Sequence, residues 1–331
     1  MNLRAYASNS IELNNFFKDN ENCDVSRTQK LLGLQWDTSL DTLILRLPSQ
    51  NPNDIKWTKR KVLKYIASIY DPLGLLSPTV LLGKLFLQTL WKLELSWDEL
   101  LPPEQDNRWQ QITSSWNISE LSFPRQLFDM DDQEAKYEVH VFTDSSAIAY
   151  CAAAYVGQRR SDGTSSSSLI MSKSRLAPLN HTITIPRLEL AAMMIGSKLL
   201  TFVTQHLSIQ LSRKFLWTDS SAALSWTKGN KDLPVFVRNR VRIIQENTTD
   251  VVLKHIPGNH NPADIGSRGA SIQELLDSTT WWNGPNFLAD DDDKWPNDSF
   301  QSLPTTAYVE DDTNTTYGEA QPSRLNLCCI I

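Results

Sequence analysis

The chain has 331 residues, 40% of them hydrophobic, so it is long enough and apolar enough to bury one or two cores. Its four cysteines show no paired spacing, which argues against a zinc site or a disulfide framework and favours a reducing compartment. The sequence shows no signal peptide and no apolar run of membrane-spanning length. We therefore expect an intracellular protein, cytoplasmic or nuclear and not secreted, with no membrane partner.

The net charge of −6 hides an uneven distribution along the chain. Residues 1–135 carry −4, residues 136–270 carry +7 and residues 271–331 carry −9. A basic segment that also contains isolated carboxylates suits a polyanionic substrate that is handled through metal ions. Ordinary scatter of surface charge is the alternative reading of the same numbers.

Residues 1–135 are expected to form a smaller, mostly helical segment. Two apolar phrases, residues 30–36 and 41–48, predict a hairpin with its turn over residues 37–41. Helices are expected to begin at Thr58, at Pro78 and at Pro102. The apolar stripe of the second helix is typical of a helix-packing core.

The phrase Tyr-Asp-Pro-Leu-Gly-Leu-Leu-Ser-Pro at residues 70–78 resembles the Pao-type region of BEL/Pao long-terminal-repeat retrotransposon polyproteins. Residues 30–36, 58–60 and the Trp-Trp-Asn-Gly-Pro phrase at 281–285 resemble the same family, so the resemblance covers nearly all of residues 1–288. It implies that residues 1–135 are a reverse transcriptase thumb- or connection-like segment. The polymerase motif of the family, an aromatic residue followed by two aspartates, does not occur. The pair Asp131–Asp132 does not represent it, since this pair follows Met130 and lies in a polar linker. The integrase expected downstream in the polyprotein, with its His/Cys zinc site, does not occur either.

Residues 136–270 are expected to form a second domain. The order of elements is strand, strand, strand, helix, strand, helix, helix, strand, helix, and residues 138–144 alternate as a strand with one buried face. Asp144 ends the first strand and Asp219 the fourth, each within Thr-Asp-Ser-Ser. Glu189 lies in the first turn of the helix that follows Pro186, and Asp264 opens the last helix.

These four acids have plain readings as well as a functional one. A strand-end aspartate is often a turn residue, and a glutamate in a first helical turn complements the helix dipole. Two carboxylates on neighbouring strand ends, however, repel each other unless a cation lies between them.

In their order and context, the four acids resemble those of the ribonuclease H fold of retroelements. The resemblance implies an α/β fold, a mixed five-stranded sheet with flanking helices, in which four acids hold two divalent ions. The catalytic and metal-binding roles then fall on Asp144, Glu189, Asp219 and Asp264. Carboxylates suit Mg²⁺, with Mn²⁺ as the alternative, and two such ions can activate water and stabilise the leaving oxygen of a phosphodiester.

Other candidate site residues are less specific. Many ribonucleases of this fold carry a mobile histidine before the last acid. In this sequence that position falls near Asn259, so the neighbouring His260 is a candidate for assisting product release. The alternative is that His260 is an ordinary surface histidine. Phosphate contacts of an RNA–DNA hybrid are expected from basic residues, each of which could equally be solvated surface charge: Lys173, Arg175, Lys228, Lys231 and Arg238. Residues 271–331 are expected to be an acidic, largely disordered tail after the Trp-Trp-Asn-Gly-Pro motif.

Two functions remain open from the sequence. The first is a retrotransposon-derived ribonuclease H that hydrolyses RNA in RNA–DNA hybrids, with the polymerase and integrase parts of the polyprotein as further partners. The second is a catalytically inactive remnant that binds nucleic acid. The presence of all four acids favours the enzyme. An aspartic peptidase is excluded, because neither Thr-Asp-Ser copy continues into the Asp-Thr/Ser-Gly turn that peptidases use.

Overall fold

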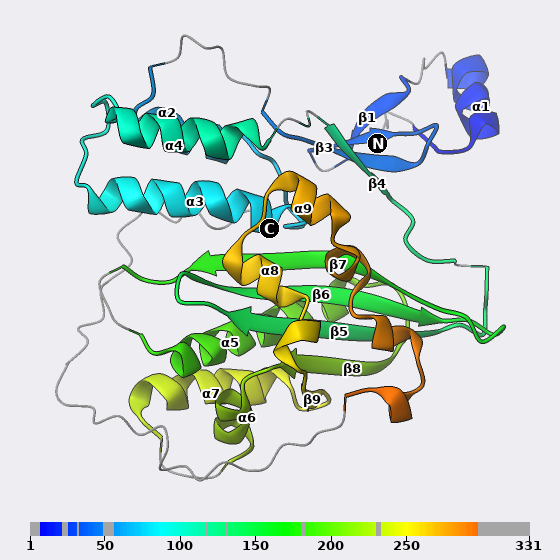
Figure 1. The fold of residues 1–331 in the computed structure, drawn as a ribbon. Coiled ribbons are helices and arrows are strands. Elements are labelled where there is room, and N and C mark those ends of the chain that lie inside the picture. Colours follow the sequence, from blue (N-terminus) through cyan, green and yellow to red (C-terminus); the bar gives the residue numbers. More distant parts are fainter. Residues whose placement is uncertain are drawn as a thin grey trace. The chain divides into compact units, whose positions relative to one another are not determined.

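The computed structural model describes residues 7–21, 26–31, 33–48, 56–116, 118, 120–129, 131–179, 183–229 and 233–296. The chain divides into two compact units (Figure 1). One is formed by residues of Met1–Asp71 and Phe86–Gln133, the other by residues of Pro72–Leu85 and Glu134–Ile331.

The first unit contains helices and a small antiparallel sheet. The sheet has the order β1-β2-β3-β4, and its hairpin between β2 and β3 confirms the expected turn before residue 42. A cluster of aromatic side chains forms the core, with Trp109 packed 5.1 Å from Phe86 and 5.6 Å from Trp57 between ring centroids. Its elements are α1 (Ile11–Glu21), β1 (Thr28–Leu31), β2 (Leu34–Asp37), β3 (Thr42–Arg46), α2 (Lys59–Ala67), the second half of α3 (Ser77–Lys92), α4 (Pro103–Ser114) and β4 (Glu120–Pro124).

The second unit is built on a mixed five-stranded sheet. The strand order is β7-β6-β5-β8-β9, with β5, β6 and β7 antiparallel and with β8 parallel to both β5 and β9. The order of strands and helices expected from the sequence is confirmed. The elements are β5 (Lys136–Ser145), β6 (Ala149–Arg159), β7 (Ser165–Leu176), α5 (Ile185–His206), β8 (Leu211–Thr218), α6 (Ser221–Lys228), α7 (Val235–Asn247), β9 (Val252–His255), η1 (Gly258–His260) and α8 (Ala263–Arg268).

The central strand β5 is buried on both faces, whereas its sequence pattern predicted one buried face. Helix α5 packs closely on one face, because a Cβ on Gly196 would overlap the side chain of Thr143. On the other face, the polar side chains of Glu138 and His140 are buried and satisfied. Arg213 donates to Glu138 at 2.7 Å, and the indole nitrogen of Trp217 donates to His140 Nδ1 at 3.2 Å.

Residues 72–85 join the second unit, which differs from the expected boundary at residue 135. The amide of Ser172 on the edge strand β7 donates to the carbonyl of Leu73 at 2.8 Å, and the Trp281 indole donates to the carbonyl of Leu75 at 3.0 Å. The backbone groups on the open side of an edge strand need hydrogen-bond partners, and residues 72–85 supply an acceptor for the amide of Ser172 on β7.

Residues 271–296 are folded, which differs from the expected disordered tail. They form α9 (Ile272–Asp277), α10 (Thr279–Asn283), η2 (Asn286–Ala289) and η3 (Asp292–Lys294). Trp281 is fully buried, and the Trp295 ring lies 5.2 Å from the ring of Phe215 on β8. Asp292, in the exposed acidic run at residues 290–293, pairs with Arg213. These aromatic anchors outweigh the acidic composition; the rest of the expected tail, residues 297–331, lies outside the described residues.

None of the helices in the described part of the chain combines the length and the apolar character that a membrane crossing requires.

Candidate metal centre

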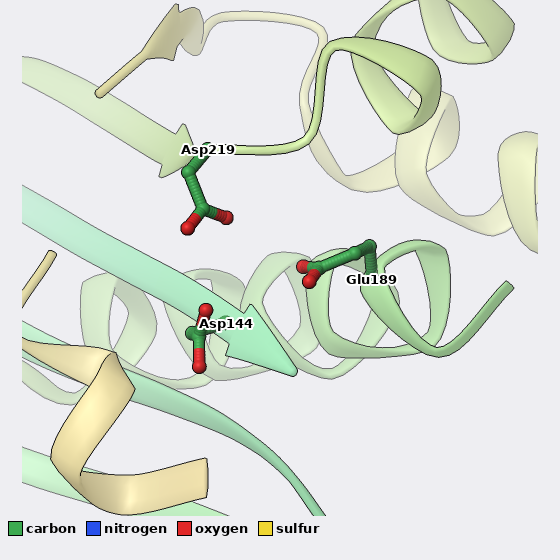
Figure 2. A group of neighbouring side chains, drawn as sticks. All are labelled: Asp144, Glu189 and Asp219. Carbon is green, nitrogen blue, oxygen red and sulfur yellow. The ribbon is translucent and has the colours of Figure 1, made fainter. Parts of the chain in front are cut away.

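Three of the four expected acids meet at one edge of the five-stranded sheet. Thr143 on β5 pairs with Thr218 on the parallel strand β8, so the next residue of each strand, Asp144 and Asp219, emerges at the same edge. Glu189 reaches the same place from α5. Each of the three offers a carboxylate oxygen, and these oxygens lie within 4.8 Å of one another (Figure 2).

The three carboxylates are poorly solvated. Asp144 is 4% exposed and Glu189 is 8% exposed. Burial, with the charges of Asp219 and Asp144 adding to it, raises the pKa of Glu189 to about 9. Burial also raises the pKa of Asp144 to about 7, and the neighbouring charges of Asp219 and Asp264 act in the same direction. The pKa of Asp219 is raised as well, chiefly by burial.

Two oxygens of this group, Glu189 Oε2 and Asp219 Oδ1, are buried and find no hydrogen-bond donor among the described residues. An unpaired buried carboxylate oxygen is costly unless a cation compensates for it. Mg²⁺ and Mn²⁺ prefer oxygen ligands, so Asp144, Glu189 and Asp219 fit a hard divalent ion.

The carboxylate of Asp144 is held by a residue that the sequence did not single out. Ser267 on α8 is fully buried, and its hydroxyl donates to Asp144 Oδ2. The same helix is tied back to the end of β5, because the Ser146 hydroxyl donates to the carbonyl of Ser267 at 2.8 Å. Just before α8, the amide group of Asn261 donates to the carbonyl of Thr143 at 2.9 Å. Ser267 lies three residues after Asp264, and this spacing places both residues on one side of a helix. The spacing is the sequence signal from which Ser267 could have been predicted to lie near the acids.

Asp264 lies in the first turn of α8, as expected, but outside the group of three. Its side chain is 40% exposed, and its Oδ1 accepts from Arg268 Nε at 2.6 Å. Its charge still raises the pKa of Asp144, so it lies at the rim of the same centre. Glu189 also differs slightly from its expected place, since α5 begins at Ile185 and Glu189 therefore opens the second turn.

The loop between β9 and α8 passes close to Asp219. A Cβ on Gly258 would stand 3.2 Å from Asp219 Oδ2, and His255 Nε2 lies 3.1 Å from the backbone carbonyl of Asp219. Asn259 and His260 are exposed in this loop. Assistance of product release by His260 stays a prediction.

The basic residues expected to contact phosphate lie in two separate places. Lys173 and Arg175 are exposed on the edge strand β7. Lys228 ends α6, and Arg238 is exposed on α7. Lys231 lies outside the described residues. The five positions therefore stay predictions.

The sequence matches one family model of known proteins. Residues 58–220 match the family model described as the Pao retrotransposon-like RNaseH-like domain, which confirms the resemblance found in the sequence. No curated protein matches the sequence.

Three similar solved structures have low sequence identity. The N-terminal RNase H domain of a Mycobacterium tuberculosis protein, fused to maltose-binding protein, is 11% identical over 38% of this chain and 92% of that chain, with a TM-score of 0.27. RNase H1 from the archaeon Halobacterium salinarum is 17% identical over 43% of this chain and 98% of that chain, with a TM-score of 0.24. The foamy viral protease-reverse transcriptase in complex with an RNA/DNA hybrid is 11% identical over 71% of this chain and 30% of that chain, with a TM-score of 0.35.

Proposed function

Because residues 58–220 carry a Pao retrotransposon-like RNaseH-like domain, we propose that the chain is a metal-dependent ribonuclease that hydrolyses RNA in RNA–DNA hybrids. One observation supports this above all: three carboxylates from separate elements converge in a buried group, and two of their oxygens have no partner in the described part of the chain. Such a group destabilises the fold when it is ionised and empty, which is typical of a site shaped by its function.

Each residue of the centre has a proposed role. Asp144, Glu189 and Asp219 hold divalent cations through their carboxylate oxygens, and Asp264 completes the set from the rim. Bound Mg²⁺ or Mn²⁺ supplies the positive charge that activates a water molecule and stabilises the departing 3′ oxygen. Ser267 donates to Asp144 Oδ2 and would leave Asp144 Oδ1 available to a cation.

The expected substrate follows from charge and shape. The segment 136–270 carries a net charge of +7, which attracts a polyanion despite the carboxylates in its centre. An RNA–DNA hybrid offers 2′-hydroxyl groups on one strand only, and these distinguish the strand that is cut. The polymerase and integrase parts of the polyprotein are proposed as further partners.

An inactive nucleic-acid-binding remnant is the competing function, and the pairing of Asp264 with Arg268 favours it. The full chain should be incubated with labelled RNA–DNA hybrid, RNA duplex and DNA duplex, each in Mg²⁺ and in EDTA. We expect cleavage of the RNA strand of the hybrid in Mg²⁺ alone. Hybrid binding without cleavage in any divalent metal would instead support the remnant.

A further inference from the structure

Arg268 is a cation beside the carboxylate centre that has no role in the chemistry described above. It ends α8, the helix that carries Asp264 in its first turn, and its Nε donates to Asp264 Oδ1 at 2.6 Å. This hydrogen bond raises the pKa of the Arg268 guanidinium, and the charges of Asp144 and Asp219 add to the effect. A monovalent cation therefore lies at the rim of a centre made of four carboxylates.

The backbone of α8 is packed tightly, so that a change at the rim is confined to side chains. The helix lies against β6, where a Cβ on Gly266 would overlap the sulfur of Cys151. Ser267, the neighbour of Arg268, is fully buried and bound to the first acid of the centre. Asp264 and Arg268 therefore keep their places along the helix, and their side chains can separate only by rotating.

The pair of Asp264 and Arg268 is weak enough to be opened. The Arg268 side chain is 70% exposed and that of Asp264 is 40% exposed. An exposed ion pair at i, i+4 spacing contributes little to stability, because water and salt screen it. A divalent ion carries twice the charge of a guanidinium and approaches a carboxylate oxygen more closely, so it attracts the carboxylate more strongly.

A cation meets different conditions at the grouped acids and at Asp264. In the group of three, Glu189 Oε2 and Asp219 Oδ1 find no hydrogen-bond donor in the described part of the chain, so these oxygens are available at once. At Asp264, one oxygen is already held by Arg268. An ion that takes this oxygen must first separate the pair.

We propose that Arg268 is a positioning residue that acts as an exchangeable counter-cation of the centre. It holds the Asp264 carboxylate at the rim in the metal-free protein, and a divalent ion takes the held oxygen of Asp264 only by displacing it. This inference rests on the proposed metal-dependent function and assigns to one residue the control of how readily the fourth acid joins the centre. The pair that favours an inactive remnant when it is permanent is, on this account, opened by metal.

The test measures Mn²⁺ binding to the full chain by isothermal titration calorimetry, at constant ionic strength and without nucleic acid. Arg268→Gln removes the competing cation and should lower the dissociation constant of the weakest resolved Mn²⁺ site about three- to tenfold. Arg268→Lys should lower it by a smaller factor, because lysine keeps the charge but lacks the planar guanidinium. Arg242→Gln is the matched control: it breaks an exposed i, i+4 pair with Glu246 on α7 and should bind Mn²⁺ like wild type.

A double-mutant cycle with Asp264→Asn separates exchange at Asp264 from general repulsion of cations. In the Asp264→Asn background, Arg268→Gln should leave the affinity for Mn²⁺ unchanged, because the competition acts through the Asp264 carboxylate. An equal gain in both backgrounds would show that Arg268 only repels cations at a distance, and it would refute the exchange. Wild-type affinity in Arg268→Gln would refute it as well.

The outcomes separate this inference from the proposed enzyme. If the cycle gives the predicted result but wild type never cleaves hybrid, Arg268 keeps its role and the enzyme falls. If wild type cleaves hybrid while Arg268→Gln binds Mn²⁺ like wild type, the enzyme stands and the inference falls. Because Arg268 is exposed, Arg268→Gln should melt within about 2 °C of wild type in EDTA. If it does not fold, Arg268→Lys decides, and wild-type affinity for Mn²⁺ in that variant would refute the exchange.

Discussion

Replacing Asp144 by Asn should stabilise the metal-free protein at alkaline pH. The substitution keeps the shape of the side chain and leaves an oxygen that can accept from Ser267, but it removes one buried negative charge. The pKa of Asp144 rises from 3.8 to about 7, and each unit corresponds to about 1.4 kcal/mol. The charge of this one carboxyl therefore costs at most about 4 kcal/mol at pH 8. In a unit of this size, a gain of 2–4 kcal/mol raises the melting temperature by about 5–10 °C.

The pH dependence has a definite sign. A carboxyl whose pKa is raised by folding contributes stability that is present below its unfolded pKa, near 4, and is lost as pH rises through its folded pKa. For Asp144 and Glu189 the loss runs from about pH 4 up to about 7 and about 9 respectively. Metal-free wild type should thus lose stability between pH 5 and pH 9, and Asp144→Asn should lose less.

Thermal unfolding in EDTA from pH 5 to pH 9 measures both effects. Asp293→Asn removes the same charge from an exposed position and is the control, with no change expected. If Asp144→Asn melts at the wild-type temperature at pH 8, or if both proteins show the same pH dependence, the argument from buried like charges is refuted.

Three further substitutions test the surroundings of the centre. Ser267→Ala removes a hydrogen bond to the charged carboxylate of Asp144, which is worth about 1.5–3 kcal/mol. It should raise the Mg²⁺ concentration at which half of the metal-dependent shift in melting temperature is reached. An unchanged midpoint would count against a role of Ser267 in positioning Asp144. Trp281→Ala empties a fully buried site and should lower the free energy of unfolding by about 3–5 kcal/mol, measured in urea, whereas a loss below 1 kcal/mol would mean that α10 is not part of the core. Gly196→Ala should cost about 1–3 kcal/mol in the same assay, because the new methyl group overlaps the side chain of Thr143; a neutral result would show that α5 can move away from β5.

The parts of the centre that could be predicted from the sequence depend on local pattern. Asp144 and Asp219 follow strands with the same Thr-Asp-Ser-Ser ending, and parallel strands bring such endings to one edge. The helix that carries Glu189 has a clear apolar stripe, so its packing against the sheet was predictable. The helical turn on which Glu189 lies was not predictable, because no side-chain cap marks the start of α5 at Ile185.

The parts that could not be predicted depend on contacts between distant segments. Leu73 meets Ser172, and Trp281 meets Leu75, across separations that no local pattern indicates. Composition also misled in the tail, since residues 271–296 are folded around the buried Trp281 and Trp295, although the acidic run at residues 290–293 is exposed as its composition predicts. Asp264 lies where it was expected along the chain, but its side chain pairs with Arg268 and is not one of the three grouped carboxylates.

The most direct measurement is the initial rate of hybrid cleavage in Mg²⁺ by wild type, Asp144→Asn and Asp293→Asn. If the buried carboxylates hold the catalytic ions, wild type and Asp293→Asn should cleave the RNA strand at the same rate, and Asp144→Asn should show no cleavage while keeping its fold. Cleavage by Asp144→Asn at the wild-type rate, or no cleavage by any of the three folded proteins, would contradict the assignment.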